Sequence, residues 1–282
     1  MVAPVIQRLE EAHRERDFFG GRFNAYSGLC AWCAVACAEL GEFAQGRGFF
    51  EKGLRFAQEV NHPYSLAFIK LMGGIMLTVK GDGKEAVEHL ENCIGHLEEV
   101  QAEILLGTAL GYLGHAYGRA GQVTRALDHL KRGIQVLQDM GMPLNVPNFF
   151  IYLAEVHFDS GDLESAERTI QEGVELCVRH GAKGIEPSAR IWMGRILAKK
   201  KEPAFEMAEE SLLHGIRIAE ERRYRSFMAE GHLFLGELYS ARGQGEKARY
   251  HLKRAEDMCQ DMGMDYWLPQ VKTALRELEE EK

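Results

Sequence analysis

Three cysteines near the start of the chain have a spacing that could serve a metal ion. Cys30, Cys33 and Cys37 are three and four residues apart, which places their thiols on one face of a helix. A structural zinc site generally needs four ligands, and no second pair of Cys or His lies close to these three in sequence. A free thiol also packs well as a small apolar side chain. We therefore expect core cysteines and no metal site.

The remaining residue patterns give no prediction of catalysis. The 11 histidines form no HExxH motif, and no Ser/His/Asp or paired-carboxylate arrangement stands out from the background. The glycine-rich stretch at residues 107–111 does not follow a predicted strand, so it does not indicate a dinucleotide loop. No glycine-rich phosphate loop with Lys and Ser or Thr is present. We expect a protein without catalytic residues or a cofactor.

The composition indicates an ordinary folded protein and narrows its partners. Of 282 residues, 46% are hydrophobic and 27% are charged, which is typical of globular chains. The net charge of −8 disfavours a general nucleic-acid binder, because an acidic surface repels phosphates. No apolar run approaches the roughly 20 residues of a membrane span, and the first residues do not form a secretory signal. We expect a soluble, cytoplasmic protein with no nucleic-acid or membrane partner.

A pattern of small and large apolar residues recurs about every 40 residues, and it sets the elements that must position any site. Leu113, Gly114, Tyr117 and Gly121 recur one period later as Leu153, Ala154, His157 and Gly161. The segment at residues 138–142 recurs at 260–264, an offset of 122 that includes a two-residue insertion near Pro203. We predict six units at residues 27–66, 67–106, 107–146, 147–186, 187–228 and 229–266, with a remnant helix of a preceding repeat in 1–26 and a capping helix in 267–282.

Each unit is predicted to be a pair of antiparallel helices. Its apolar residues fall three and four apart, the spacing of one helical face, and a mid-unit glycine can close the turn in a left-handed conformation. Five prolines, Pro63, Pro143, Pro147, Pro187 and Pro269, precede first helices, where the unpaired N–H groups make proline harmless. The predicted fold is all-α: a right-handed superhelical solenoid of about six helix pairs.

The pattern resembles the tetratricopeptide repeat (TPR) family, most closely at Leu113, Gly114, Tyr117, Gly121 and Ala126. The unit of 40 residues is longer than the common type of 34. The stretches at 40–43, 61–65, 232–239 and 262–269 further resemble the carboxyl-terminal TPR region of bacterial class III adenylate or guanylate cyclases that carry an ATPase and TPRs. That resemblance implies the regulatory part of a larger signalling protein, whose cyclase and ATPase domains this chain does not contain. The segment from Val5 to Phe19 then predicts the second helix of a truncated unit.

The first helices of such a solenoid line its inner face, so the spacing predicts which side chains point inward. In the third to sixth units many of these positions are polar or charged, and the candidate binding residues among them are Thr108, His115, Arg119, Asn148, Glu155, Asp159, Arg195, Lys199 and Glu237. The sign alternates along Arg119, Glu155, Arg195 and Glu237, which predicts a charge ladder between units about 10 Å apart. Two interpretations remain open: the charges pair with one another, at about 0–1 kcal/mol per exposed pair, or they recognise a charged peptide or small ligand.

The first two units have a largely apolar inner face instead. The inward positions are Gly28, Ala31, Val35 and Glu39 in the first unit and Phe68, Leu71, Ile75 and Val79 in the second. Because large exposed apolar patches are uncommon in monomers, we expect this surface to be covered by upstream domains of the same polypeptide, by a dimer partner or by a bound peptide helix. Trp267 is expected to pack the final helix onto the last repeat.

Two functions follow from these observations. The first is a non-enzymatic interaction and sensing module that binds a protein or peptide and belongs to a larger signalling protein. The alternative is a stand-alone peptide or small-molecule receptor built from long TPR units. Continuation of the gene upstream into a phosphate-binding loop would favour the first.

Overall fold

The computed structural model describes residues 3–142 and 145–280, and these residues form fourteen helices and no strand. The helices are α1 (Ala3–Glu11), α2 (Ala25–Glu39), α3 (Phe43–Val60), α4 (Pro63–Lys80), α5 (Gly83–Glu99), α6 (Glu103–Arg119), α7 (Val123–Asp139), α8 (Val146–Asp159), α9 (Leu163–Arg179), α10 (Glu186–Lys199), α11 (Phe205–Arg222), α12 (Arg225–Ala241), α13 (Gly245–Met262) and α14 (Leu268–Glu280). The predicted all-α class is confirmed. None of the helices in the described part is long and apolar enough to cross a membrane.

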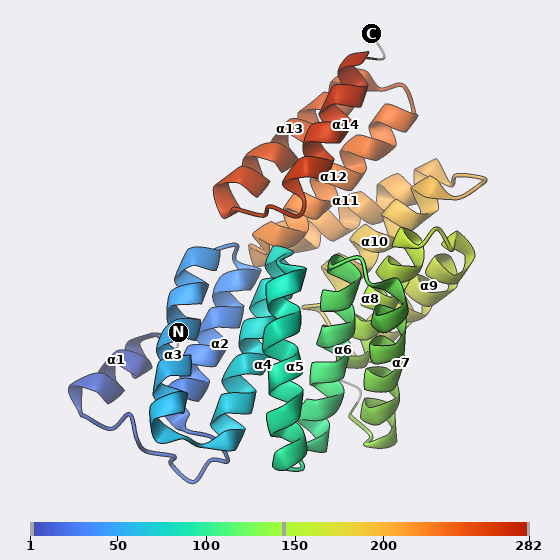
Figure 1. Cartoon of the computed structure of the whole chain (residues 1–282). Helices are drawn as coiled ribbons and strands as arrows, with labels where there is room; N and C mark the ends of the chain where they lie inside the picture. Colours follow the sequence, from blue (N-terminus) through green and yellow to red (C-terminus); the bar gives the residue numbers. More distant parts are fainter. Residues whose placement is uncertain (1–2, 143–144, 281–282) are drawn as a thin grey trace. The chain divides into compact units, whose positions relative to one another are not determined.

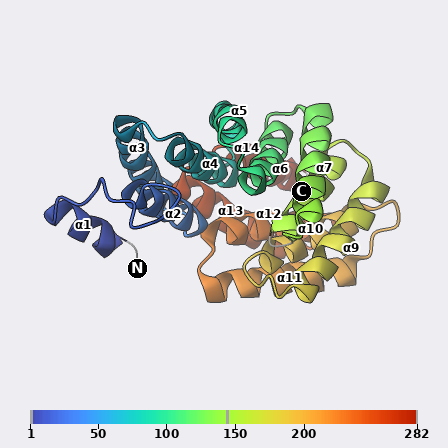
Figure 2. The ribbon, with the colours of Figure 1, turned by 90° about the horizontal axis from the view of Figure 1, so that it is seen from below.

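The chain divides into two compact units, Met1–Met140 and Gly141–Lys282, which are larger than the six 40-residue repeats and are called below the first and second unit. In the first unit, α2 packs against α3, α4 against α5 and α6 against α7, and α1 rests on α2. The first helices α2, α4 and α6 also contact one another in sequence order. Figure 2 looks along these helices and shows the first helices in one row and the second helices α3, α5 and α7 in another. This part of the chain is therefore a stack of antiparallel pairs.

The second unit repeats the arrangement. The pairs are α8 with α9, α10 with α11 and α12 with α13, and the first helices α8, α10 and α12 contact one another in order (Figure 1). Helix α14 packs against α13 and also touches α12. It therefore takes the place of the first helix of a further pair.

Local sequence signals begin and end these helices. Pro63 starts α4, and Pro147, Pro187 and Pro269 are the second residues of α8, α10 and α14. Pro143 lies outside the described residues. Between first and second helices the backbone is left-handed at glycine in five pairs, at Gly41, Gly81, Gly121, Gly161 and Gly243. A residue without a β-carbon adopts this conformation at little cost, which is why the turn can be so short.

A second set of glycines allows the two helices of a pair to approach closely. A β-carbon built on Gly194 would lie 2.5 Å from Leu212 Cγ, and one on Gly236 would lie 2.6 Å from Leu252 Cγ. The same glycine–leucine contact recurs in the first unit, at Gly74 with Leu90 and Gly114 with Leu130. These glycines let the leucine of the second helix pack directly against the backbone of the first helix.

The cysteines belong to the core, as predicted. Cys30, Cys33 and Cys37 are all buried. Burial raises the pKa of Cys30 to about 12 and that of Cys37 to about 11, and it also raises the pKa of Cys33. These thiols therefore remain protonated at neutral pH and pack as apolar groups. Within the described residues no three His, Cys, Asp or Glu side chains gather as a metal site.

The amino-terminal segment differs from its prediction. We expected a helix from Val5 to Phe19, but α1 ends at Glu11 and left-handed residues follow at His13, Phe19 and Gly20. The first helices of the six pairs begin one to four residues before the expected unit starts. The unit boundaries themselves stay a prediction.

Candidate groove at the inner face of the second unit

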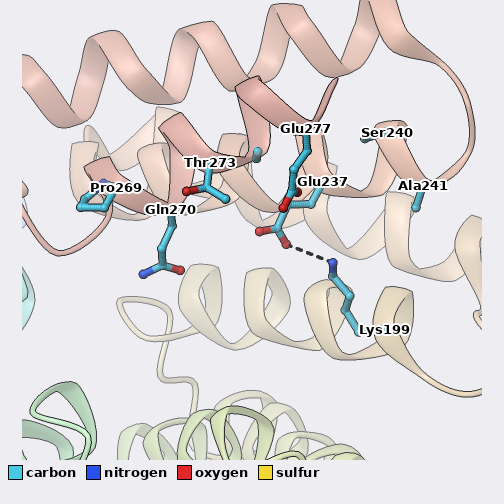
Figure 3. A pocket seen from close by; sticks show the side chains of 9 residues that line it. Lys199, Glu237, Ser240, Ala241, Pro269, Gln270, Thr273 and Glu277 are labelled. Carbon is cyan, nitrogen blue, oxygen red and sulfur yellow. Dashed lines mark ion pairs between the residues drawn. The ribbon is translucent and has the colours of Figure 1, made fainter. Parts of the chain in front are cut away.

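A cavity of about 540 Å³ lies among α10, α12 and α14 of the second unit (Figure 3). Its lining consists of Lys199 from α10, Glu237, Ser240 and Ala241 from α12, and Pro269, Gln270, Thr273, Ala274 and Glu277 from α14. Helices α10 and α12 are the first helices of their pairs and α14 takes the place of a first helix, so the cavity is lined by the helices whose residues the sequence predicted to point inward. We call it the α14 groove.

Two of its charged residues, Lys199 and Glu237, were predicted as inner-face residues. The structure brings them together: Lys199 Nζ lies 3.8 Å from Glu237 Oε2. Glu237 also faces Arg195, whose Nη2 is 3.6 Å from Glu237 Oε1. Two walls of the groove, on α10 and α12, thus carry residues that the repeat pattern predicted to point inward.

The third wall was missed, although the sequence contains a signal for it. Gln270, Thr273 and Glu277 lie 40 residues after Glu230, Leu233 and Glu237. Extending the repeat frame by one more step would have placed these three side chains inward. We expected only a capping helix here, because the segment is amphipathic and ends in Glu-Glu-Glu-Lys.

Glu237 is mostly buried, with 17% of its side chain exposed, and its carboxylate is incompletely satisfied. Its Oε2 atom is shielded from solvent and accepts no hydrogen bond within the described structure. Both of its ion pairs exceed the 2.7–2.9 Å of a charge-assisted hydrogen bond. A buried acceptor without a hydrogen bond costs about 1–3 kcal/mol.

Arg195, which pairs with Glu237, is surrounded by aromatic rings. Its guanidinium carbon lies 4.0 Å from the ring centre of Phe234, 4.8 Å from Phe158, 5.2 Å from Trp192 and 5.9 Å from Trp267. Contact with ring faces stabilises a desolvated cation. The packing role predicted for Trp267 is confirmed, because it is 1% exposed and lies 5.6 Å from Phe234 between ring centres.

The other polar residues that were predicted to point inward differ in their exposure to solvent. Thr108, His115 and Glu155 are buried, Arg119 and Asn148 are half-buried, and Asp159 is exposed. The Thr108 hydroxyl donates to the Ile104 carbonyl at 3.1 Å, and the Asn148 amide donates to the Tyr152 hydroxyl at 2.9 Å. Arg119 belongs to the first unit and Glu155 to the second. The pairing of these two charges therefore stays a prediction.

The apolar inner face of the second pair requires a correction. We expected a partner to cover Phe68, Leu71 and Ile75, but these three side chains are already 5%, 0% and 7% exposed, and Val79 is half-buried. Phe23, from the segment before α2, stacks on Phe68 with 4.4 Å between ring centres. The chain itself supplies the cover, so an Asp at Leu71 would disrupt the core rather than a docking surface.

Stacked antiparallel pairs of this kind define a helical-repeat protein. A tetratricopeptide repeat model matches residues 147–172 and 229–254, which begin within α8 and α12. The chain therefore contains tetratricopeptide repeats, as the sequence predicted. No curated protein sequence matches the chain.

Several solved structures share the fold at low sequence identity. The Rap protein complexed with competence and sporulation factor aligns with a TM-score of 0.71 at 13% identity, over 99% of this chain and 81% of its own. A Signal Transduction ATPase with Numerous Domains (STAND) protein with a tetratricopeptide repeat sensor, from Pyrococcus horikoshii, gives 0.56 at 18%, over 99% and 41%. Aspartyl phosphate phosphatase F from Bacillus subtilis gives 0.59 at 12%, over 90% and 70%. These similarities show the fold alone, and this chain spans less than half of the length of the Pyrococcus protein.

Proposed function

We propose that this chain is a non-enzymatic interaction and sensing module that binds a protein or peptide segment in the α14 groove. The observation that carries the proposal is the groove itself, a concave space with convergent polar side chains on three inner-face helices. Helical-repeat proteins use their inner faces as extended binding surfaces. The volume of about 540 Å³ falls in the range of about 300–1,000 Å³ usual for ligand sites, which suits a short segment of a partner.

The residues that line the groove favour binding over catalysis. They include one Lys, two Glu, one Ser, one Thr and one Gln, and no His or Cys. Such groups can fix the orientation of a ligand through hydrogen bonds and charge. Their pattern does not provide a nucleophile held by a neighbouring base.

The wider context is also part of the proposal. We infer that the module regulates a larger signalling protein, of the cyclase–ATPase–TPR kind that the sequence resembles. The similarity of the fold to a STAND protein with a tetratricopeptide repeat sensor supports this inference. The six free and buried cysteines are consistent with a reducing compartment such as the cytoplasm.

The proposal is tested by filling the groove. Peptides selected from a random display library on the wild-type chain are measured against the Thr273→Trp variant, whose indole occupies the cavity. We expect their affinity to fall at least about tenfold, since one steric block removes more than 1.4 kcal/mol of binding. The control is Glu280→Trp, which adds the same ring to α14 at an exposed position outside the groove.

Two results would contradict the proposal. One is binding of every selected peptide to the Thr273→Trp variant as tightly as to the wild type, with both chains equally helical by circular dichroism. The other is a library that gives no binder at all.

A further inference from the structure

We propose that the α14 groove accepts a cationic side chain of the partner segment, a Lys or Arg, between the carboxylates of Glu237 and Glu277. This inference rests on the proposed function and names the chemistry that the groove recognises. It is argued from the order of charges along the inner face, from the unsatisfied oxygen of Glu237 and from the surroundings of Glu277.

The first argument is the order of charges at one inner-face position. Successive first helices of the second unit carry Glu155, Arg195, Glu237 and Glu277 at this position. The sign alternates up to α12, and Arg195 and Glu237 form the ion pair that this alternation predicts. On α14 the alternation fails, because a carboxylate follows a carboxylate. A cation between the last two positions would restore it.

The second argument is the state of the Glu237 carboxylate. Its two cationic neighbours lie 3.6 and 3.8 Å away, too far for hydrogen bonds, and its buried Oε2 accepts none. A carboxylate has about four acceptor positions and can take a bidentate guanidinium. Glu237 lines the groove and 17% of its side chain is exposed there, so a cation that enters the groove meets a carboxylate whose ion pairs within the chain are long.

The third argument is the position of Glu277. Its side chain is exposed and forms no ion pair with any residue that the structure describes. Figure 3 shows its carboxylate directed into the same space as that of Glu237, with Lys199 on the opposite wall. Any ligand in the groove meets two carboxylates and one ammonium group. A cation is therefore attracted by two of these charges and repelled by one, whereas an anion is repelled by two and attracted by one.

Polar neighbours suit the stem and backbone of the same ligand. Thr273 and Ser240 add hydroxyl groups to the lining, and Gln270 adds an amide whose nitrogen donates to the Tyr266 carbonyl at 3.3 Å. That contact leaves the amide oxygen of Gln270 as an acceptor for a peptide N–H. The groove can thus hold a charged side chain and the main chain that carries it.

The test uses a blocked pentapeptide, acetyl-Gly-Gly-Arg-Gly-Gly-amide, and the same peptide with neutral citrulline in place of Arg. Titrations are followed by the amide NMR signals of α10, α12 and α14. We expect the Arg peptide to bind more tightly than the citrulline peptide by about fivefold, which is the effect of one partly exposed ion pair. Equal affinities of the two peptides would overturn the inference.

Three variants separate the cation site from a general surface effect. Glu277→Gln should weaken binding of the Arg peptide, and Lys199→Met should strengthen it, because Lys199 competes for Glu237 and repels the ligand. Glu280→Gln removes the same charge from α14 outside the groove and should leave binding unchanged. A loss of affinity with Glu280→Gln equal to that with Glu277→Gln, or no gain with Lys199→Met, would contradict the proposed site.

Failure of this inference is distinguishable from failure of the proposed function. If display-selected peptides lose affinity for Thr273→Trp but bind Glu277→Gln as well as wild type, the groove binds a segment by other chemistry and only the cation inference is wrong. If Thr273→Trp binds the selected peptides normally, the proposed function is wrong as well.

Discussion

Arg195 illustrates how much one side chain contributes to the second unit. It is 9% exposed, it contacts four aromatic rings from α8, α10, α12 and the segment before α14, and it pairs with Glu237. Burying a cation is unfavourable unless it is paired and surrounded by polarisable groups. The aromatic cluster and the carboxylate together make this burial possible, and they hold one wall of the groove in place.

We predict that Arg195→Ala lowers the free energy of unfolding by about 3 kcal/mol, the lower end of the range for breaking a buried ion pair. The change leaves Glu237 short of a partner and opens space among the rings. Lys199→Ala, at a side chain 48% exposed, should cost about 0–1 kcal/mol. Urea denaturation monitored by circular dichroism measures both, and similar losses in the two variants would contradict the role given to Arg195.

A pair of histidines gives the second unit a dependence on pH. His232 Nδ1 and His251 Nδ1 are 2.9 Å apart, so one ring donates and the other accepts. Burial, followed by His251 and Arg254, lowers the pKa of His232 to about 3, and burial also lowers the pKa of His251. Both rings are therefore neutral in the folded chain at pH 7.

The sign follows from comparison with the unfolded chain, in which a histidine has a pKa near 6.5. Below pH 6.5 this histidine binds a proton in the unfolded chain, whereas His232 in the folded chain stays neutral down to about pH 3. The free energy of unfolding therefore falls as the pH falls. From pH 7 to pH 5 we expect a loss of about 2 kcal/mol from His232, at about 1.36 kcal/mol per pH unit below 6.5. Urea midpoints at the two pH values measure it.

The control for this prediction is His232→Gln, which keeps a hydrogen-bonding side chain but does not titrate. Its stability should change less between pH 7 and pH 5 than that of the wild type, whereas His180→Gln, at an exposed position, should behave as the wild type does. An unchanged pH dependence in His232→Gln would show that other groups cause the loss.

At the scale of helices, the glycine–leucine contact decides how closely the two members of a pair approach. A β-carbon at Gly194 would meet Leu212 Cγ at 2.5 Å and the Ala208 carbonyl oxygen at 2.8 Å. The carbonyl cannot move without shifting α11. The pair therefore tolerates no larger residue at this position without separating its helices.

We predict that Gly194→Ala destabilises the chain by about 1–3 kcal/mol, the usual cost of overpacking a core. Gly48→Ala is the matched control, since a β-carbon on Gly48 would meet nothing within 4 Å in the middle of α3. That change should stabilise by about 0.5–1 kcal/mol, because alanine loses less backbone entropy in a helix. Thermal or urea unfolding that shows the same sign for both variants would contradict the argument.

Helix α14 differs from the earlier first helices at this same position. Where α10 and α12 have Gly194 and Gly236, α14 has Arg276, which is exposed and donates to the Thr273 hydroxyl at 3.1 Å. Lys272 and Glu279 are exposed beside it. Arg276 places a guanidinium group where α10 and α12 have no side chain, so the glycine–leucine contact of the earlier pairs has no counterpart on α14.

At the scale of the whole molecule, a repeat stack couples each pair mainly to its neighbours. Local opening therefore spreads only part of the way along the chain. We predict that Gly194→Ala increases amide hydrogen exchange in α10, α11 and α12 much more than in α4 and α5. Exchange measured by mass spectrometry on peptic fragments tests this, and an equal increase in every helix would indicate a single cooperative unit instead.

The 40-residue pattern was enough to predict much of this protein. It indicated paired helices, core positions for Cys30, Cys33 and Cys37, and inward positions for Lys199 and Glu237, which line the groove. These properties depend on the spacing of residue types within a helix and between adjacent helices. Such spacing is local in sequence, so the same pattern predicts it in each of the six repeats.

The solvent exposure of each position depended on the tertiary structure. The cover over Phe68 comes from Phe23, in a segment outside the repeat, and the third wall of the groove comes from α14, which follows the last complete pair. A repeat pattern states which way a side chain points from its own helix. Which surface lies opposite it is set by packing between segments that do not share the pattern, and only the folded chain brings those together.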